Sequence, residues 1–281
     1  MSIKINLYMQ PMSHIKSYFE MVDLAKKYDI EYLEILNQFE FETPDIEFAK
    51  RLRKYADERG IKFVCVSVGA NLIGEDSKEK NEYVKKYADV CAILGSPLLH
   101  HTIAIEFQNP EKVFGEKEKN FNKGISAARE IYDYAEKLGV RTIHEEQGFL
   151  FNGIEGYQNL VDNIDRNTGT LLDFGNIRFR DDDILDFAEK FKDRIAHVHA
   201  NDYKVYGSEI PEGDYYTSYN KTNFKEAKFG EGDNDFYGII KFLKSIGYSG
   251  YCAIELSPIG PDEEKTFRED LEYLRKVIKE A

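Results

Sequence analysis

Short β-branched, apolar runs alternate with longer amphipathic stretches along the whole 281-residue chain. A short apolar run bounded by turn residues is typical of a strand, and apolar residues at every third or fourth position predict a helix that packs by one face. About eight such pairs are present. The expected strands cover residues 3–7, 31–35, 61–68, 98–100, 140–143, 170–172, 195–198 and 251–254, and the expected helices cover 14–28, 45–59, 77–94, 116–138, 234–246 and 263–279.

Three of the expected helices end at one kind of junction, a glycine placed shortly before the next strand. These junctions are Leu94-Gly95, Leu138-Gly139 and Ile246-Gly247. Their recurrence indicates a repeated βα unit. An open, doubly wound sheet would carry a glycine-rich phosphate loop after its first strand, and none follows Leu7. We therefore expect an α/β fold, a single (β/α)8 TIM barrel domain over residues 1–281, with a long loop over 203–229 after the seventh strand.

The chain is acidic, with 51 Asp and Glu against 38 Lys and Arg residues and a formal net charge of −13. Such a surface repels phosphate backbones and anionic lipids, so we expect no nucleic acid and no membrane as partner. No apolar stretch approaches the roughly 18 residues of a membrane span, and the N-terminus does not resemble a signal peptide. Cys65, Cys91 and Cys252 lie far apart within apolar runs, as buried thiols of a reducing compartment would. These features predict a soluble, cytoplasmic protein.

Four successive expected strands end in an acidic or imidazole side chain: Glu145, Asp173, His199 and Glu255. In a TIM barrel the carboxyl ends of the strands form the active face, so these side chains are expected to converge. Three carboxylates in a small volume repel one another and need either raised pKa values or a cation. We predict one bound divalent metal ion. Three oxygens and one imidazole nitrogen favour Mn²⁺, and Mg²⁺, Co²⁺ and Zn²⁺ remain open.

Several segments are similar to one family of barrels. They are KFGEGDNDF at 228–236, the stretch from LKSIGYSG to AIE over 243–255, HVHAND at 197–202 and LDFGN at 172–176. The Gly-Glu-Gly and Gly-Tyr-x-Gly elements are specific when they occur together and in this order. Over nearly its whole length the chain resembles the xylose isomerase-like TIM barrel superfamily, which includes sugar phosphate isomerases and epimerases, ketose 3-epimerases, and inosose isomerases and dehydratases.

Carried over by position, the resemblance implies that Glu145, Asp173, His199 and Glu255 bind the metal, and that Glu145 and Glu255 are also the catalytic base and acid. The implied activity is isomerisation or epimerisation of a small-molecule sugar, ketose or cyclitol. The two glutamates would pass a proton between carbons through a metal-stabilised enediolate. Glu145 and Glu146 are adjacent, and strand alternation lets only one of them face the pocket. Alignment with the family pattern favours Glu145.

Two positions depart from the family pattern. Asn176 stands where many relatives carry a histidine; an amide can bind a substrate hydroxyl but cannot exchange a proton near neutral pH. Relatives often place an arginine shortly after the seventh-strand histidine, and the nearby cation in this chain is Lys204. A lysine lacks the bidentate fork of arginine, so we expect Lys204 to contact substrate without binding a phosphate tightly.

Other residues at strand ends are candidate substrate contacts. His100 and His101 end the fourth strand, and of the two we select His101. Glu34 ends the second strand and can bind a sugar hydroxyl. Asp202 lies just past the seventh strand, where it can contact substrate or support a metal ligand. The other strand histidines are expected to pack against helices: His144 and His197.

Three other functions stay open at this point. A lyase of the inosose or dehydroshikimate dehydratase type would use the same metal and base but would expel a hydroxyl beta to the carbonyl. An abasic-site endonuclease of the same superfamily needs more strand-end histidines for its trinuclear zinc site, and the acidic surface opposes DNA. A non-catalytic barrel that binds a ligand or serves as a partner subunit would keep the site without turnover. Association into a homo-oligomer is also left open.

Overall fold

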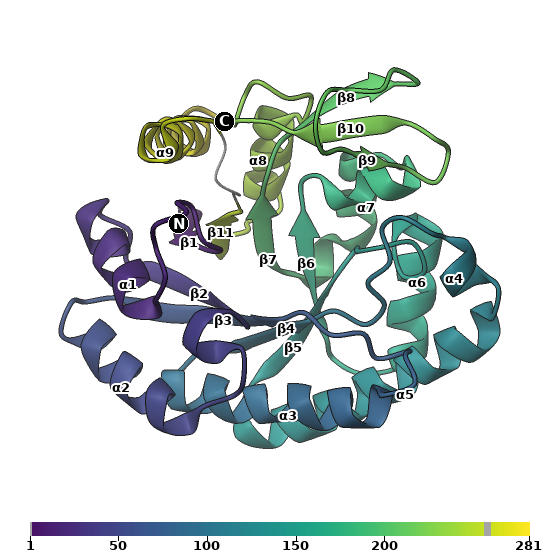
Figure 1. The fold of residues 1–281 in the computed structure, drawn as a ribbon, viewed down its shortest axis with the longest axis horizontal. Coiled ribbons are helices and arrows are strands. Elements are labelled where there is room, and N and C mark those ends of the chain that lie inside the picture. The colour runs from purple at the N-terminus through teal and green to yellow at the C-terminus, as the bar shows by residue number, and fades with distance from the viewer. Residues whose placement is uncertain (1, 256–259) are drawn as a thin grey trace.

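Eight parallel strands close into a barrel within residues 2–255 and 260–281, which the computed structural model describes. Neighbouring strands follow chain order, and β11 closes the ring by pairing with both β7 and β1 (Figure 1). The expected α/β barrel is confirmed. Its strands are β1 (Lys4–Leu7), β2 (Tyr32–Leu36), β3 (Lys62–Val68), β4 (Leu98–His101), β5 (Arg141–Glu145), β6 (Gly169–Asp173), β7 (Ile195–Ala200) and β11 (Tyr251–Ile254).

Helices surround the barrel on the outside (Figure 1). Several begin at a side chain that accepts a backbone N–H of the first turn, as Ser17, Asp45 and Asp183 do for α1, α2 and α7. The helices are α1 (Tyr18–Lys27), α2 (Ile46–Asp57), α3 (Ser77–Leu94), α4 (Glu111–Phe114), α5 (Lys117–Ala135), α6 (Gly153–Ile164), α7 (Ile184–Phe191), α8 (Phe236–Ser245) and α9 (Glu263–Glu280), with short 3₁₀ turns η1 (Phe39–Phe41), η2 (Glu136–Leu138), η3 (Asn176–Arg180) and η4 (Lys192–Arg194). None of these helices is long and apolar enough to cross a bilayer.

The long connection after β7 folds into a small sheet of its own. Its antiparallel strands β8 (Tyr203–Gly207), β9 (Tyr216–Thr217) and β10 (Asn223–Glu226) pair in the order β8-β10-β9, outside the ring of barrel strands (Figure 1). Aromatic side chains of this sheet pack on one another, and Phe224 also contacts Phe179 of η3. The expected loop is therefore an ordered extension beside the barrel rim.

The interior of the barrel changes from apolar to polar along the strands. One buried cluster inside the ring consists of Cys65, Leu98, Ile143 and Leu171. Side chains two residues apart on a strand share a face. The next inward positions on β3 to β6 are therefore polar or acidic: Ser67, His100, Glu145 and Asp173. The apolar cluster forms a floor, and the polar layer above it faces the carboxyl ends of the strands.

The remaining buried apolar side chains lie largely between the barrel and the helices. Strand β3 is buried on both faces, since six of its seven residues are inaccessible. Its Val66 belongs to the outer layer and its Cys65 to the interior floor. Cys65, Cys91 and Cys252 are buried free thiols, in agreement with the reading of the sequence.

Candidate metal and active site

Four side chains from four adjacent strand ends meet at the carboxyl-end opening of the barrel. Glu145, Asp173, His199 and Glu255 each offer a ligand atom, and these atoms all lie within 4.8 Å of one another. Register explains the meeting: Asp173 stands beside His199 in the β6–β7 pair, and Glu255 directly follows β11. The structure thus brings together the set that the sequence singled out. We call these four residues the acidic cluster.

Side-chain and backbone amides hold the carboxylates of the acidic cluster. The side-chain Nδ2 of Asn176 donates to Glu145 Oε1 over 2.6 Å. Asn201 Nδ2 donates to Asp173 Oδ2 over 2.7 Å and to Glu255 Oε2 over 2.9 Å. Asp173 Oδ1 also accepts the backbone N–H groups of Gly175 and Asn176. These donors fix the orientation of each carboxylate before any ligand arrives.

The carboxylates perturb one another because they are close and poorly solvated. Burial, followed by the charge of Asp173, raises the pKa of Glu145 well above its usual range. Burial and the neighbouring Glu255 raise the pKa of Asp173 to about 8. Burial also acts to raise the pKa of Glu255, but His199 outweighs it and holds that pKa low. The cluster carries more negative charge than its surroundings compensate, which a bound cation would relieve.

The donor set fits a divalent cation. The ring Nδ1 of His199 is buried, forms no hydrogen bond and lies 3.5 Å from Glu255 Oε2, which is an ion-pair distance. A buried ring nitrogen that forms no hydrogen bond, beside three carboxylates, has the composition of a mixed oxygen and nitrogen metal site. Glu145, Asp173, His199 and Glu255 are therefore the residues that would hold the ion.

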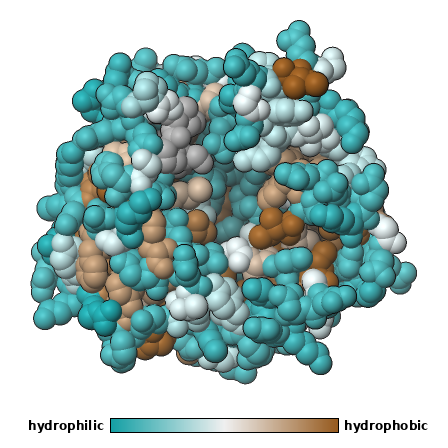
Figure 2. All heavy atoms as spheres, viewed as in Figure 1, coloured by the Kyte–Doolittle hydropathy of each residue, from teal (hydrophilic) through white to brown (hydrophobic). Residues whose placement is uncertain are grey.

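A cavity of about 240 Å³ adjoins the acidic cluster. Figure 2 shows a hollow near the middle of the face that it presents, with hydrophilic and apolar residues around it. Polar and aromatic side chains of the barrel, of η3 and of the small sheet line the cavity. The lining residues are Met9, Phe107, Gln147, Asn176, Phe179, Asn201, Asp202, Tyr203, Tyr216, Glu226, Ala227 and Glu255. None of these described lining residues is a lysine or an arginine.

Asp202 reaches the cavity wall but its oxygens are engaged in the loop that follows β10. Oδ1 accepts the backbone N–H groups of Tyr203 and Asn234, and Oδ2 accepts those of Gly230 and Gly232. Three of these charge-assisted hydrogen bonds, from Gly230, Gly232 and Asn234, tie the segment that contains Gly-Glu-Gly to the end of β7. The structure therefore assigns Asp202 a role in holding this loop, which borders the cavity.

Lys204 and Glu34 do not line the cavity. The Lys204 ammonium pairs with Asp233 Oδ1 over 2.9 Å, and nearly half of the lysine side chain is exposed. Glu34 is completely buried inside the barrel, where it accepts hydrogen bonds from Ser67, His197 and other side chains. Direct substrate contact, which the sequence suggested for both residues, is not supported by these positions.

The choice of His101 over His100 requires correction. His100 points into the barrel, with Nδ1 3.0 Å from Ser67 Oγ and Nε2 3.4 Å from Glu145 Oε2. His101 takes the opposite face of β4, where its ring packs edge-on against His144 and Nδ1 contacts the carbonyl of Thr102. Alternation along the strand gives the inward position to only one of the two histidines.

The expectation for His197 was also wrong. His197 lies two residues before His199, so both rings face the barrel interior. Its Nε2 lies 2.6 Å from Glu34 Oε2. His144, in contrast, alternates with the inward-facing Ile143 and Glu145, and its ring packs edge-on against that of His101. Glu146 is buried behind the site, where Oε1 accepts the backbone N–H of Asp173.

Asn201 is the functional candidate that the sequence reasoning missed. Asn201 follows His199 by two residues and belongs to the HVHAND segment, one of those that resemble the xylose isomerase-like family. Its amide bridges Asp173 and Glu255. The period of two along an extended chain was the available signal.

The chain is similar to known proteins in sequence and in fold. An inosose dehydratase of Clostridium perfringens is 25% identical over 249 residues, covering 82% of this chain and 80% of that protein. A xylose isomerase domain protein of Planctomyces limnophilus superposes with a TM-score of 0.78 at 16% identity, covering 99% and 97% of the two chains. The D-psicose 3-epimerase of Clostridium cellulolyticum superposes with a TM-score of 0.77 at 18% identity, covering 98% and 99%.

These structural likenesses concern the fold, which agrees with the closed barrel of parallel strands described above. A family model extends the agreement to the sequence, because it matches residues 22–277. That range contains the whole acidic cluster and the small sheet after β7. The chain belongs to the family of xylose isomerase-like TIM barrels.

Proposed function

We propose that this protein is a metal-dependent isomerase or epimerase that moves a proton next to the carbonyl of an uncharged sugar, ketose or cyclitol. The observation that carries the proposal is the meeting of two glutamates, an aspartate and a histidine at one end of the barrel, beside a cavity. A divalent cation bound there would stabilise the oxyanion that forms when a proton leaves the carbon next to a carbonyl. Mn²⁺ is our first choice of ion.

Glu145 and Glu255 are the proposed proton carriers. Burial and the charge of Asp173 raise the pKa of Glu145, and His199 holds the pKa of Glu255 below its usual range. Two carboxyl groups whose environments separate their pKa values suit complementary acid and base roles. In this proposal Glu255 removes the proton as the base, and Glu145 supplies one as the acid. For a substrate of the opposite handedness the roles reverse.

The cavity supports a small, uncharged substrate. Its volume of about 240 Å³ lies below the range of roughly 300–1,000 Å³ typical of pockets for larger ligands. The lining carries carboxylates and amides for hydroxyl groups, while Phe179 and Tyr203 offer apolar ring surface. A phosphate group would meet negative charge without a lysine or arginine among the described lining residues. A monosaccharide or cyclitol without phosphate is both small enough for this volume and free of the negative charge that the lining would repel.

A dehydratase is the second candidate, and the similarity to inosose dehydratases favours it. The first step would be the same removal of a proton next to a carbonyl. The two reactions then diverge, because a dehydratase loses the hydroxyl beta to the carbonyl as water, whereas an isomerase or epimerase returns a proton to carbon.

One experiment separates the two candidates. The protein is stripped with chelator, reloaded with Mn²⁺ and incubated in D₂O with a panel of ketoses and keto-cyclitols. Deuterium incorporation at carbon, followed by NMR and without loss of water, is the result expected of an isomerase or epimerase. Absorbance of an enone product identifies a dehydratase. Neither signal with any substrate, from protein shown to hold the metal, would refute both.

A further inference from the structure

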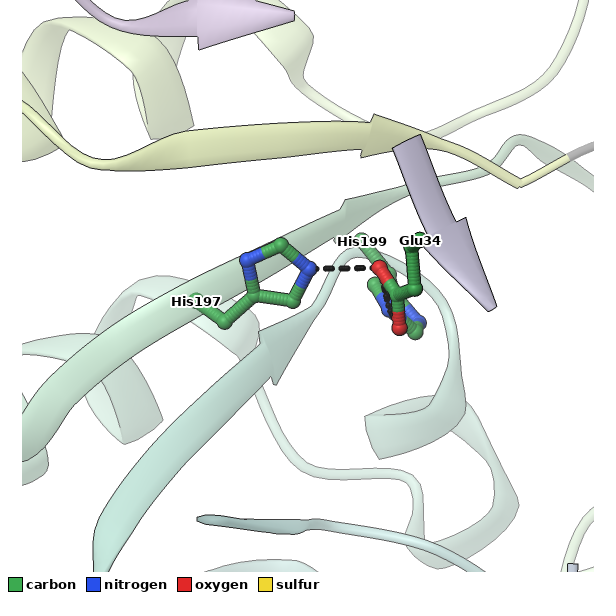
Figure 3. Close-up of side chains that lie close together, drawn as sticks. All are labelled: Glu34, His197 and His199. Carbon is green, nitrogen blue, oxygen red and sulfur yellow. Dashed lines mark hydrogen bonds and ion pairs between the residues drawn. The ribbon is translucent and has the colours of Figure 1, made fainter. Parts of the chain in front are cut away.

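A second polar cluster lies inside the barrel, deeper than the acidic cluster, and it shares His199 with it. Glu34 of β2, His197 and His199 offer ligand atoms within 4.8 Å of one another, and all three side chains are buried. Figure 3 shows the His197 ring directed at the Glu34 carboxylate, with the His199 ring beside that carboxylate in this view. Glu34 joins these residues from far away in the sequence, on β2.

Four side chains contact the two carboxylate oxygens of Glu34 at hydrogen-bond distance. Oε1 accepts from Ser67 Oγ over 2.5 Å and lies 3.1 Å from His199 Nε2. Oε2 lies 2.6 Å from His197 Nε2 and accepts from Asn6 Nδ2 over 3.3 Å. An ionised carboxylate only accepts hydrogen bonds, so the two imidazoles donate from their Nε2 atoms.

This arrangement divides the two ring nitrogens of His199 between the two clusters. Nε2 faces Glu34, while Nδ1 faces Glu255 at 3.5 Å and has no hydrogen-bond partner. Where a cation takes the place of the Nδ1 proton, a histidine that donates its other ring N–H to a carboxylate presents Nδ1 as a lone pair in a fixed direction. Tyr8 limits ring movement further, because its ring centroid lies 4.5 Å from that of His199.

We propose that Glu34 is a positioning residue that holds the Nε2–H of His199, so that Nδ1 is the nitrogen presented to the metal ion of the acidic cluster. This inference rests on the proposed metal-dependent function and adds to it a residue that does not line the cavity and is not itself a member of the acidic cluster, but contacts its His199. His197 binds the other carboxylate oxygen of Glu34, Oε2, and so keeps the Glu34 side chain from rotating away from His199. Through these contacts, Glu34 on β2 and His197 on β7 together fix the orientation of the His199 ring at the metal site.

The alternative occupant of the deeper cluster is a second cation between Glu34, His197 and His199. The hydrogen-bond distances of 2.6 and 3.1 Å disfavour it, because the ring protons already fill the space between nitrogen and oxygen. A metal there would have to displace both protons. The stoichiometry of metal binding distinguishes the two arrangements.

The first test is calorimetric titration of metal-free protein with Mn²⁺. We compare the wild type with Glu34→Gln and with Asp270→Asn, a matched removal of a buried carboxylate that contacts the backbone of Phe229 instead of the barrel interior. The amide nitrogen of a glutamine cannot accept a hydrogen bond, so one imidazole N–H loses its acceptor. We expect one ion per wild-type chain, an affinity about 10–100-fold weaker in Glu34→Gln, and little change in Asp270→Asn.

The second test needs no variant that could fail to fold. Histidine ¹⁵N NMR of the Zn²⁺-loaded wild type, a diamagnetic form, reports which nitrogen of His199 carries hydrogen. The expected result is a proton on Nε2 and metal on Nδ1. Metal on Nε2, unchanged affinity in Glu34→Gln, or two ions per wild-type chain would each overturn the positioning role.

Neither readout depends on turnover, so the two proposals can fail separately. A wild type that binds Mn²⁺ through Nδ1 but turns over no substrate contradicts the proposed function alone. Protein that binds no divalent ion at all contradicts both, since Glu34 then has no metal ligand to position.

Discussion

The side-chain amide of Asn176 donates a 2.6 Å hydrogen bond to Oε1 of Glu145. Asn176 begins the 3₁₀ turn η3, and its own backbone N–H, together with that of Gly175, binds Asp173 Oδ1. The hydrogen bond favours the ionised form of Glu145 against the effect of burial and of Asp173, which raise its pKa. A side chain that also lines the cavity thus fixes the direction of a proposed catalytic group and partly offsets the rise in its pKa.

Replacing Asn176 should therefore slow catalysis more than it weakens binding. A hydrogen bond to a charged group contributes about 1.5–3 kcal/mol, and each 1.36 kcal/mol corresponds to a tenfold rate effect. We expect Asn176→Ala to lower kcat about 10–100-fold with a smaller change in KM. Steady-state kinetics on the substrate found in D₂O tests this. A variant with wild-type kcat would show that the contact does not matter for the reaction.

The two proposed proton carriers should be individually indispensable. Glu145→Gln and Glu255→Gln keep the shape of each side chain and remove its ability to carry a proton. General acid–base catalysis contributes about 10²–10⁴-fold, so we expect losses of at least this size in the rate of deuterium exchange. Circular dichroism checks that each variant is folded, and Mn²⁺ titration measures how much metal each variant binds. Retained exchange in a loaded variant would contradict the role of that residue.

Lys204 should be dispensable. Its ammonium is nearly half exposed and pairs with Asp233 outside the cavity lining. Exposed pairs of this kind contribute about 0–1 kcal/mol. We expect Lys204→Ala to keep kcat/KM within about twofold of the wild type and to lower the free energy of unfolding by no more than about 1 kcal/mol. A large rise in KM would instead support the substrate contact that the sequence suggested.

Position 232 should not accept a side chain, because the Asp202 carboxylate lies against the Gly232 backbone. A Cβ at 232 would lie 2.1 Å from Asp202 Oδ1 and 2.8 Å from the carbonyl oxygen of Tyr203. Overpacking of this kind costs about 1–3 kcal/mol, so Gly232→Ala should lower the midpoint of urea unfolding accordingly. Gly69→Ala is the matched control, because its new Cβ would meet its nearest neighbour at an ordinary 3.6 Å. Equal midpoints for the two variants would show that the loop adapts.

The raised pKa of the buried Asp270 should make the free energy of unfolding depend on pH. Burial raises its pKa from 3.8 to about 7, although the N–H of Phe229 acts in the opposite direction. The folded protein then binds a proton at Asp270 more strongly than the unfolded chain does. Its contribution to stability is present in full below about pH 4 and is lost as the pH rises through about 7.

The variant Asp270→Asn removes that proton equilibrium. We expect its free energy of unfolding, relative to the wild type, to improve between pH 5 and pH 8, as measured by urea titration at each pH. Parallel pH profiles for the two proteins would show that Asp270 titrates at its ordinary value.

Much of the candidate site followed from local pattern. Short apolar runs alternating with amphipathic stretches, and the repeated helix–Gly–strand junctions, predicted the barrel. Strand-end positions predicted the four members of the acidic cluster, whose ligand atoms the structure brings within 4.8 Å of one another. The period of two along a strand, applied to His199, would have placed His197 and Asn201 on the inner side as well. These inferences succeed because a strand's side-chain period is a property of its own backbone.

Contacts between distant strands could not be predicted in this way. Which of His100 and His101 faces the interior depends on how β4 is rotated between β3 and β5, and the approach of Glu34 to His199 depends on closure of the whole ring. Lys204 turns to Asp233 because the Gly-Glu-Gly segment folds back on β7. The amino-acid sequence determined the strands, their alternation and the residues at their ends. Only the tertiary structure decided inward rotation and pairing partners, because both are set by the register among strands that are remote in the chain.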